Sequence, residues 1–568
     1  MLVLFVAWYN AILTYSNPFH YDGDALQHNF WVQSFWASRL TDIDPIARFY
    51  ASDAMSPMGY RWLMQLMGSI GEIQRVAETA MIGLTLATGW MFYVLGRRAA
   101  GSSWGGLILV GCIMWFAIFY ERPFGSTLLQ RHFAPIIIAG GLWGLVSRNV
   151  WAVGAAFLAS ALFYPITLAV LGLTAVLHEV IRLVIDKRMP KGWWLAVLLG
   201  LAALGVMIAR DVPAEYGQRV TADVARSMDV FHEGGRAQYW IADRETFLFT
   251  HHRSGLGHKP IAFIKAAIFL VPLLALSWRK ASLAGGLLLA VGVLIWALAI
   301  LFPFHLYLPN RHVRMPLPIG YSLLLATTIP AAFVTLRGWV ERLIGSPQDT
   351  AGMPWARLAL GVIVPVAGVV WFVNHFRAPA VRMWTYNQAV SERGPELPRY
   401  VERYLRALAP ETFVAGHPAD VSHIPLLTGR PTIASRKTLN PYFPDFYHEV
   451  LRPRAEDSVR AYYAADWEDV DRLHELYGVS VFYDVAGDQR TKGHYYEEEP
   501  LNSMSLEALD RLGDRPRVLA NPPADRVIVR DELRGITLIR VGPLDAVRVR
   551  NADGSTSSFF SNPKTAGS

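Results

Sequence analysis

The feature that most constrains this chain is a series of hydrophobic runs long enough to cross a lipid bilayer. A spanning helix needs roughly 17–25 mostly apolar residues, and its backbone must satisfy its own hydrogen bonds in lipid. The sequence therefore predicts a polytopic α-helical membrane protein with about eleven transmembrane helices. The runs, some of them short, are Met1–Ser16, Val76–Gly96, Ser103–Tyr120, Phe133–Ser147, Val150–Tyr164, Pro165–Ile185, Gly192–Ala209, Pro260–Ser277, Ala281–Phe302, Met315–Leu336 and Trp355–Asn374.

Charged residues divide the chain into two parts. Residues 1–374 hold 28 of the 53 Lys and Arg and 19 of the 46 Asp and Glu, whereas residues 375–568 hold the other 25 and 27. We expect a transmembrane domain over residues 1–374 and a water-exposed domain over residues 375–568. The net charge of +7 is explained by this distribution and does not indicate a nucleic-acid partner. The single cysteine, Cys112, excludes a disulfide framework and a cysteine-based zinc site.

Basic residues predict how the spans are oriented. Lys and Arg beside a span are kept on the cytoplasmic side, and here they fall in alternate connections. The opposite connections are then outside, including two long loops, residues 17–75 and 210–259, as is everything after residue 374. The first run lacks the charged start and cleavage site of a signal peptide, so we expect it to be a retained span. The cytoplasmic markers are Arg97, Arg98, Arg148, Lys187, Arg188, Lys191, Arg279, Lys280, Arg337, Arg342 and Arg357.

The tail has the pattern of an extracytoplasmic α/β domain. Short apolar stretches bounded by turn residues indicate strands, and longer periodic stretches indicate helices. The expected strands are residues 412–416, 432–435 and 479–484 and a hairpin formed by residues 526–530 and 535–541, and the expected helices are residues 419–428, 443–465 and 467–477.

Two carboxylates stand at the start of the first outer loop. Asp22 and Asp24 are separated by one glycine and can converge on a divalent cation or on one proton, and His28 lies one helical turn beyond Asp24. Acids at a membrane edge are costly and are usually functional. The alternative is that Asp24 only caps an interfacial helix running to about Leu40, with Phe30 and its aromatic neighbours in the lipid headgroups.

These features together resemble the GT-C class of integral-membrane glycosyltransferases. The stretch from Asp24 to His28 is similar to the Asp-Pro-Tyr-Tyr-His motif of oligosaccharyltransferase catalytic subunits, with Ala25 in place of the proline. Tyr21-Asp22-Gly23-Asp24 is similar to the acid pair of protein-mannosyltransferase-like members. The second outer loop departs from the oligosaccharyltransferase pattern, because Glu121 is its only acid where that family has an Asp/Glu-x-Asp motif.

The resemblance implies roles for these acids. Asp24 would be the catalytic base or a metal ligand, supported by Asp22 and Glu121, and His28 would orient the carboxylate or contact the substrate. The implied donor is a sugar linked to a polyprenyl phosphate, whose leaving phosphate a Mg²⁺ or Mn²⁺ ion could neutralise. The sequence leaves the need for a metal open, and Asp22 and Asp24 are its candidate ligands.

Arginine and histidine in the outer loops are candidates for phosphate binding. Guanidinium groups match phosphate oxygens in a bidentate way, and basic residues on the outer side break the charge rule that orients the spans. Pairing of these side chains with lipid headgroups is the alternative. The candidate substrate-binding residues are His28, Arg122, Arg131, Arg311, His312 and Arg314.

The sequence thus favours a membrane glycosyltransferase on the outer face of the cytoplasmic membrane, with an envelope glycan, lipid or protein as acceptor. A transporter or flippase of lipid-linked glycan is the first alternative, although no internal repeat is visible. A non-catalytic membrane subunit with the same fold is the second. Phosphate-binding loops, dinucleotide fingerprints and nucleophile elbows are absent from the sequence. A weaker candidate ligand position is the turn Gly416–Asp420 after the first tail strand.

Overall fold

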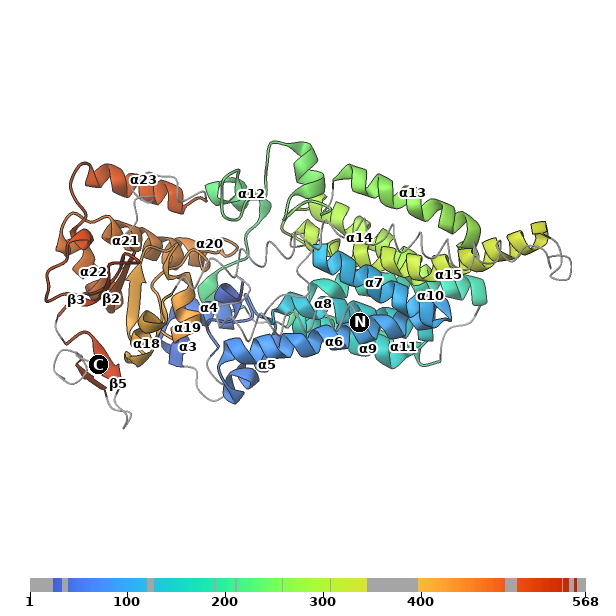
Figure 1. Cartoon of the computed structure of the whole chain (residues 1–568), viewed down its shortest axis with the longest axis horizontal. Coiled ribbons are helices and arrows are strands. Elements are labelled where there is room, and N and C mark those ends of the chain that lie inside the picture. The colour runs from blue at the N-terminus through green and yellow to red at the C-terminus, as the bar shows by residue number, and fades with distance from the viewer. Residues whose placement is uncertain are drawn as a thin grey trace.

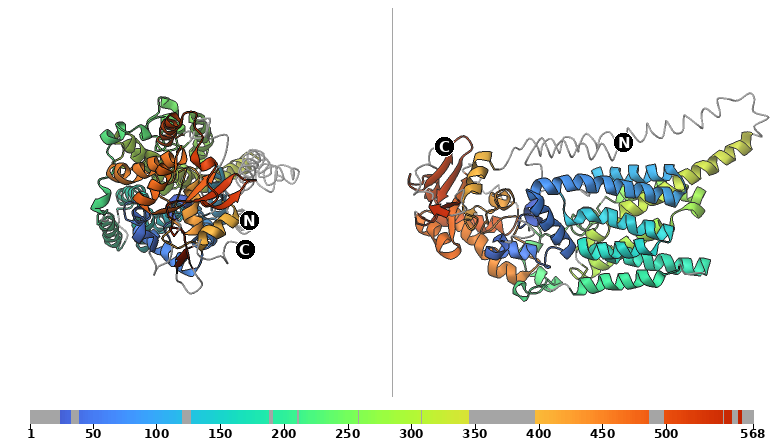
Figure 2. Two further views of the ribbon diagram at one scale, coloured as in Figure 1. Left: turned by 90° about the vertical axis from the view of Figure 1, so that its left-hand side faces the viewer. Right: turned by 90° about the horizontal axis from the view of Figure 1, so that it is seen from below.

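The computed structural model shows a long helical bundle with an α/β domain at one end (Figure 1). The helices of the bundle run roughly along the long axis of the molecule, and a second view shows the same arrangement (Figure 2, right). The structure describes residues 24–32, 39–119, 127–187, 191–209, 212–257, 259–306, 308–344, 397–485, 498–543, 545–550 and 556–558.

Nine of the predicted spans coincide with described helices of the bundle. Five of these are long and apolar enough to cross a membrane, two of them together with an adjoining 3-10 turn, and others are shorter apolar helices. The runs at residues 1–16 and 355–374 lie outside the described residues, so the expected number of eleven stays a prediction. The nine helices are α6 (Ile73–Ala100), α7 (Ser103–Phe119), α8 (Ala134–Ser147), α9 (Val150–Phe163), α10 (Ile166–Asp186), α11 (Trp193–Ile208), α13 (Pro260–Ser277), α14 (Leu283–Leu301) and α15 (Pro316–Ile344).

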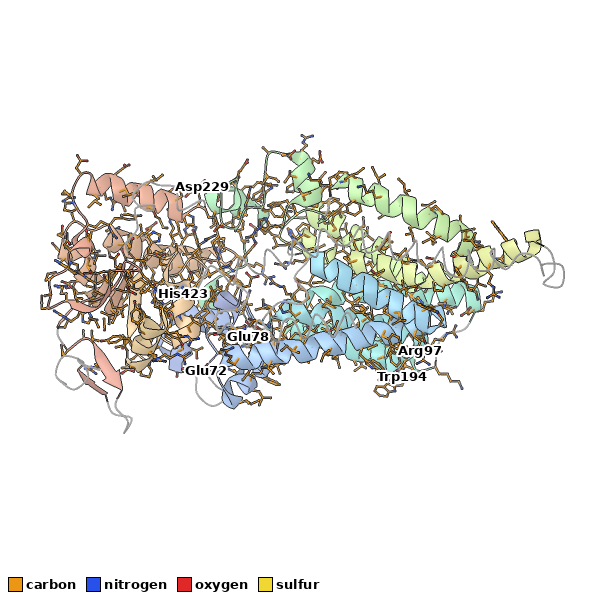
Figure 3. The ribbon with its side chains drawn as sticks, viewed as in Figure 1. Glu72, Glu78, Arg97, Trp194, Asp229 and His423 are labelled. Carbon is orange, nitrogen blue, oxygen red and sulfur yellow. The ribbon has the colours of Figure 1, made fainter. Side chains whose placement is uncertain are left out.

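Exposed tryptophans gather at one end of the bundle. Trp104, Trp151, Trp194 and Trp278 lie at helix ends next to basic residues, and each is between 66% and 69% exposed. Figure 3 shows Trp194 and Arg97 at the end of the bundle away from the α/β domain. Tryptophan beside Lys and Arg is typical of a membrane boundary. The compartment that this end faces stays a prediction.

Short helices and turns connect the bundle at its other end, next to the α/β domain. The interfacial helix considered above is wrong, because α2 ends at His28, and Phe30 and Trp31 are buried in the protein core at 4% and 2% exposure. These connecting elements are α2 (Ala25–His28), α3 (Arg39–Ile43), α4 (Pro45–Ala51), α5 (Met58–Ile70), η1 (Gln130–Phe133), η2 (Ala214–Tyr216), α12 (Ala222–Arg226), η3 (Asp229–Phe231), η4 (Thr246–Thr250) and η6 (Pro309–His312), while η5 (Trp278–Lys280) lies at the opposite end.

The tail folds around a four-stranded sheet of order β1-β2-β4-β3, in which β1 is parallel to β2 and the other pairs are antiparallel. The predicted strand at residues 432–435 is wrong, since only Thr432 forms an isolated bridge, to Val414. The tail elements are α18 (Arg399–Ala407), β1 (Phe413–Gly416), η8 (Val421–His423), α19 (Ile424–Thr428), α20 (Pro444–Phe446), η9 (Tyr447–Leu451), α21 (Arg452–Tyr462), α22 (Trp467–Tyr477), β2 (Val479–Val485), α23 (Leu501–Leu512), η10 (Val518–Ala520), β3 (Val527–Asp531), β4 (Ile536–Arg540), β5 (Arg548–Arg550) and β6 (Thr556–Ser558).

One hydrophobic core continues from the tail into the connecting loops. Phe49 of α4 is fully buried, and its ring centroid lies 5.0 Å from that of Tyr216, 5.4 Å from Phe443 and 4.6 Å from Phe446. These four rings come from the first long loop, the second long loop and the tail. The α/β domain is therefore packed on the loops through apolar contacts. It also has a separate core of its own, between its sheet and the helices α18 and α19.

Candidate functional site

Asp24 lies in an ion-paired cluster that three distant segments build. Its carboxylate contacts the guanidinium of Arg131, from η1 in the next outer connection, and lies 3.9 Å from Nζ of Lys437 in the tail. The side chain of Asp24 makes no capping hydrogen bond to α2, although it occupies the N-cap position. Asp24 thus interacts with cations from other segments, and the simple capping role is wrong.

The charges around Asp24 keep its carboxyl group ionised. Burial by itself would raise the pKa of Asp24, but the charges of Arg131, His28 and Lys437 and the hydrogen bond from Arg131 outweigh it. The pKa of Asp24 is therefore held well below its usual range. A carboxylate in this state binds cations strongly and accepts a proton weakly.

Buried hydrogen bonds fix α2 against the segment that carries Arg131. Asn29 donates from Nδ2 to the carbonyl oxygen of Leu128 at 3.2 Å, and the hydroxyl of Tyr60 donates to Oδ1 of Asn29 at 2.6 Å. Asn29 and Tyr60 are 1% and 0% exposed. Because unpaired polar groups at such depth are costly, this network holds the backbone segments that carry Asp24 and Arg131 beside each other.

Lys437 is presented by a tail segment, residues 435–442, which we call the bridging loop. The backbone carbonyls of Lys437 and Leu439 accept hydrogen bonds from the Arg236 side chain at 3.0 Å and 3.1 Å. The carbonyl of Thr438 accepts one from the Tyr50 hydroxyl at 3.2 Å. Side chains of both long loops therefore hold the backbone that positions Lys437.

Glu498 compensates the cations of this region. Its carboxylate lies 2.9 Å from Arg436 and 3.6 Å from the partly buried Arg236. Burial lowers the pKa of Arg236, and the charge of Glu498 opposes that change. Arg236 is thus an ionised side chain whose hydrogen bonds and ion pair are internal to the protein.

A second set of basic side chains, the basic cluster, lies at the ends of α14 and α15 that face the α/β domain. It consists of His251, His252 and Arg253 from one loop and Arg311 and Arg314 from another. Burial and the neighbouring guanidinium groups lower the pKa of His251 to about 4 and that of His252 to about 3. Both imidazoles are therefore neutral near pH 7, and the positive charge is carried by the arginines.

Backbone contacts bring the two loops of the basic cluster together. The amide of Asn310 donates to the carbonyl of Arg253 at 3.1 Å, and the Asn310 side chain donates to the carbonyl of His252. Asn310 is fully buried. His312, which was predicted to bind substrate, is also buried. Its Nε2 atom lies 2.6 Å from the carbonyl oxygen of Leu306, which indicates a structural role for this atom.

The bridging loop connects the basic cluster with the Asp24 cluster. Arg253 donates one hydrogen bond to the Tyr442 hydroxyl at 2.8 Å and another to the carbonyl of Arg236 at 2.7 Å. Arg236 in turn holds the backbone of Lys437, which faces Asp24. The two clusters are thus parts of one hydrogen-bonded assembly at the junction of bundle and tail.

The structure groups the predicted residues only in part. It brings Asp24, His28 and Arg131 together. It places Arg311 and Arg314 in the basic cluster. Asp22, Glu121 and Arg122 lie outside the described residues, so their roles stay predictions.

Three residues of the site were not predicted: Arg236, Arg253 and Lys437. Two of them stand in unusual polar stretches of the second long loop, Gly234-Gly235-Arg236 and His251-His252-Arg253. Those stretches were a usable signal. Nothing in the sequence connects Lys437 with a residue more than 400 positions earlier.

The turn after β1 has a structural role. His417 is fully buried, its Nδ1 accepts a hydrogen bond from the amide of Ala419 at 3.2 Å, and its Nε2 lies 3.4 Å from the Ser505 hydroxyl. Its ring packs edge-on against Tyr462 at 5.1 Å. Both ring nitrogens are engaged within the domain, so the turn is a corner between β1 and α19.

The described neighbours of Asp24 do not fit a divalent cation. A hard metal ion prefers several oxygen ligands, whereas Asp24 faces two basic side chains, Arg131 and Lys437. Within the ranges that the structure describes, three or more His, Cys, Asp or Glu side chains nowhere form a group that could hold a metal.

The fold and the site define a polytopic helical membrane protein whose α/β domain completes a charged cluster at one end of the bundle. No protein-family model matches the sequence, and no curated protein matches it. Among solved structures, the chain is similar to an oligosaccharyltransferase from Archaeoglobus fulgidus, solved with a tethered acceptor peptide. The two are 13% identical with a TM-score of 0.45, over 90% of this chain and 72% of the other.

Proposed function

We propose that the protein is a membrane glycosyltransferase that moves a sugar from a polyprenyl-phosphate-linked donor to an envelope acceptor. The observation that carries the proposal is the carboxylate of Asp24 between Arg131 and Lys437, at the end of the bundle where the α/β domain packs. A lipid-linked sugar phosphate and a water-borne acceptor can meet at such a boundary. We further propose that this end faces the outside of the cytoplasmic membrane.

In the proposed reaction, the donor phosphate binds Arg131 and Lys437, with the basic cluster as a second contact for its oxygens. Both cations then turn from Asp24 toward the phosphate. The carboxylate loses the charges that hold its pKa down, so its pKa rises toward the ordinary value and it can accept a proton. Binding of the donor thereby activates the base.

The chemical step is a displacement at the anomeric carbon. The acceptor oxygen or nitrogen forms a bond to this carbon while the bond to the phosphate oxygen breaks. The acceptor proton goes to Asp24, and the electron pair of the broken bond stays on the phosphate. Arg131 and Lys437, now bound to the phosphate, stabilise the charge that develops there, as cations do in other phosphate-transfer sites. His28 lies close enough to influence Asp24 and can orient its carboxylate.

The test is a transfer assay with labelled polyprenyl-phosphate sugars and membranes holding equal amounts of each variant. Asp24→Asn should lower turnover on the order of a hundredfold to ten-thousandfold, as expected for loss of a general base. The matched control is Asp53→Asn, because Asp53 pairs with Arg61 at 2.7 Å in the same loop but outside the site. Near-normal turnover of Asp24→Asn, or an equal loss for Asp53→Asn, would exclude the assigned role.

A transporter of lipid-linked glycan is the second candidate, and one observation favours it. His178 and Glu179 of α10 are 4% and 5% exposed, and His178 Nδ1 lies 2.8 Å from the Glu179 carboxylate. Ionisable pairs inside a membrane helix often mark a transport path. Uptake of labelled glycan into vesicles that depends on Glu179, without sugar transfer in detergent, would favour transport. Neither activity would favour the non-catalytic subunit.

A further inference from the structure

Helix α5 has one face in the protein core and one exposed apolar face. Its inner face carries Tyr60 and Met64, both fully buried. On its outer face Trp62, Leu66 and Ile70 are 57%, 53% and 72% exposed and follow one another at intervals of four residues. Residues at this spacing lie on the same side of a helix, so they form a continuous apolar stripe.

The exposed stripe carries no charge. Arg61, the one charged residue of α5, contacts Asp53 at 2.7 Å and donates a hydrogen bond to the carbonyl of Ala51 at 3.0 Å. A helix that faces water normally presents charged and polar side chains on its outer face. The composition of this face is that of a surface covered by apolar material.

The position of α5 indicates what covers it. The helix ends at Ile70, and the span α6 begins at Ile73. A Cβ atom at Gly59 would lie 2.8 Å from the Cβ atom of Leu162, so α5 packs closely on α9 where that helix ends. Figure 1 shows α5 beside the start of α6, at the end of the bundle nearest the α/β domain. The stripe thus lies at the end of the bundle where the span α6 begins and the span α9 ends.

We propose that α5 is an interfacial helix whose Trp62, Leu66 and Ile70 side chains lie in the membrane lipid on the side of the α/β domain. Tryptophan and aliphatic residues on one face of a surface helix are typical of such contacts. The same helix carries Tyr60, whose hydroxyl donates a hydrogen bond to Asn29 at the end of α2. Asn29 in turn donates to the carbonyl of Leu128, so α2 is held beside the segment that carries Arg131. Lipid contact on the outer face therefore fixes the height of the Asp24 cluster above the bilayer. This inference stands whether or not the protein transfers a sugar.

Three exposed leucines provide a matched test by nitroxide labelling in lipid nanodiscs. Leu66, Leu201 in the middle of α11 and Leu506 in α23 of the tail are 53%, 59% and 46% exposed. Each is replaced by cysteine in a Cys112→Ala background, labelled, and measured for collisions with oxygen, which concentrates in lipid, and with a water-soluble nickel complex. The label at Leu66 should favour oxygen, as at Leu201, whereas the label at Leu506 should favour nickel.

The other outcomes would overturn the proposal. A nickel preference at Leu66 equal to that at Leu506 would show that α5 faces water. Shielding from both reagents would indicate a protein partner or a second copy of the chain instead of lipid. Ile70→Cys repeats the measurement at the most exposed position of the stripe, so the result does not depend on one variant.

Discussion

Removing the Phe49 ring should weaken the docking of the α/β domain on the loops. Phe49 is fully buried, and three of its four ring neighbours, Tyr216, Phe443 and Phe446, belong to other segments, while only Tyr50 is in its own helix. Phe49→Ala costs roughly 3–5 kcal/mol at a buried site. Since most of the contacts cross the interface, we assign roughly 2–4 kcal/mol of this cost to docking.

Such a loss should raise the population of the undocked state on the order of thirtyfold to several hundredfold, because each 1.4 kcal/mol is a factor of ten. The assay is hydrogen exchange measured by mass spectrometry on the protein in nanodiscs. Amides of α4 and α20 should exchange faster by that factor.

The control is Phe92→Ala. Phe92 is fully buried inside the bundle, so its loss should weaken the bundle but leave α4 and α20 protected. Unchanged exchange of α4 and α20 in a folded Phe49→Ala protein would refute the reasoning that these rings hold the domain in place.

Three further predictions concern topology, pH and the tail. In a cysteine-free background, Ser227→Cys should react with an impermeant maleimide on intact cells and Ser103→Cys only after permeabilisation; the reverse pattern would invert the predicted orientation. The pKa values of His251 and His252 are lowered in the fold, so the folded protein favours their neutral forms. The free energy of unfolding that depends on these neutral forms is therefore complete above about pH 6.5 and is lost as the pH falls toward 4. The protection factor of the amides in their loop, which is the exchange rate of an unfolded chain divided by the observed rate at the same pH, should therefore fall between pH 7 and pH 5, and His251→Gln should reduce that fall. Residues 395–550 expressed alone should keep the sheet and its own core by circular dichroism but associate in gel filtration, because the face around Phe443 is uncovered; a random-coil spectrum would mean that the tail needs the loops to fold.

Most of the bundle could be predicted because a membrane helix is a local property of the sequence. Length and hydropathy located eight of the nine described helices to within four residues, including the break at Pro165 between α9 and α10, while α15 runs to Ile344, eight residues beyond its predicted end. Strands β1 and β2 and the hairpin of β3 and β4 were also found, since each is a short apolar stretch bounded by turn residues.

The errors concern features that depend on tertiary packing. Phe30 and Trp31 were considered for the lipid headgroups because they are large and aromatic, but the loops and the tail bury them. An amphipathic pattern cannot tell a lipid surface from another part of the same protein. The helix that does expose an apolar stripe, α5, was not singled out in the sequence.

The candidate site could be predicted in part in the outer connections of the bundle, but not in the tail. Asp24 and His28 are close in sequence, and Arg131 stands in the next outer connection, so position along the membrane was sufficient to select them. Lys437 reaches the site through a loop of the tail whose place is set by partly buried hydrogen bonds from Arg236. Such a contact has no sequence signature.

The bridging loop has a practical consequence for exchanging domains between proteins of this architecture. Its carbonyl oxygens accept hydrogen bonds from Arg236 and Tyr50, which belong to two different loops of the membrane part. A chimera that replaced only the tail would leave these two donors without acceptors unless the new domain offered carbonyls at the same places. Recombination between such chains is therefore expected to succeed only when both long loops are transferred together with the tail.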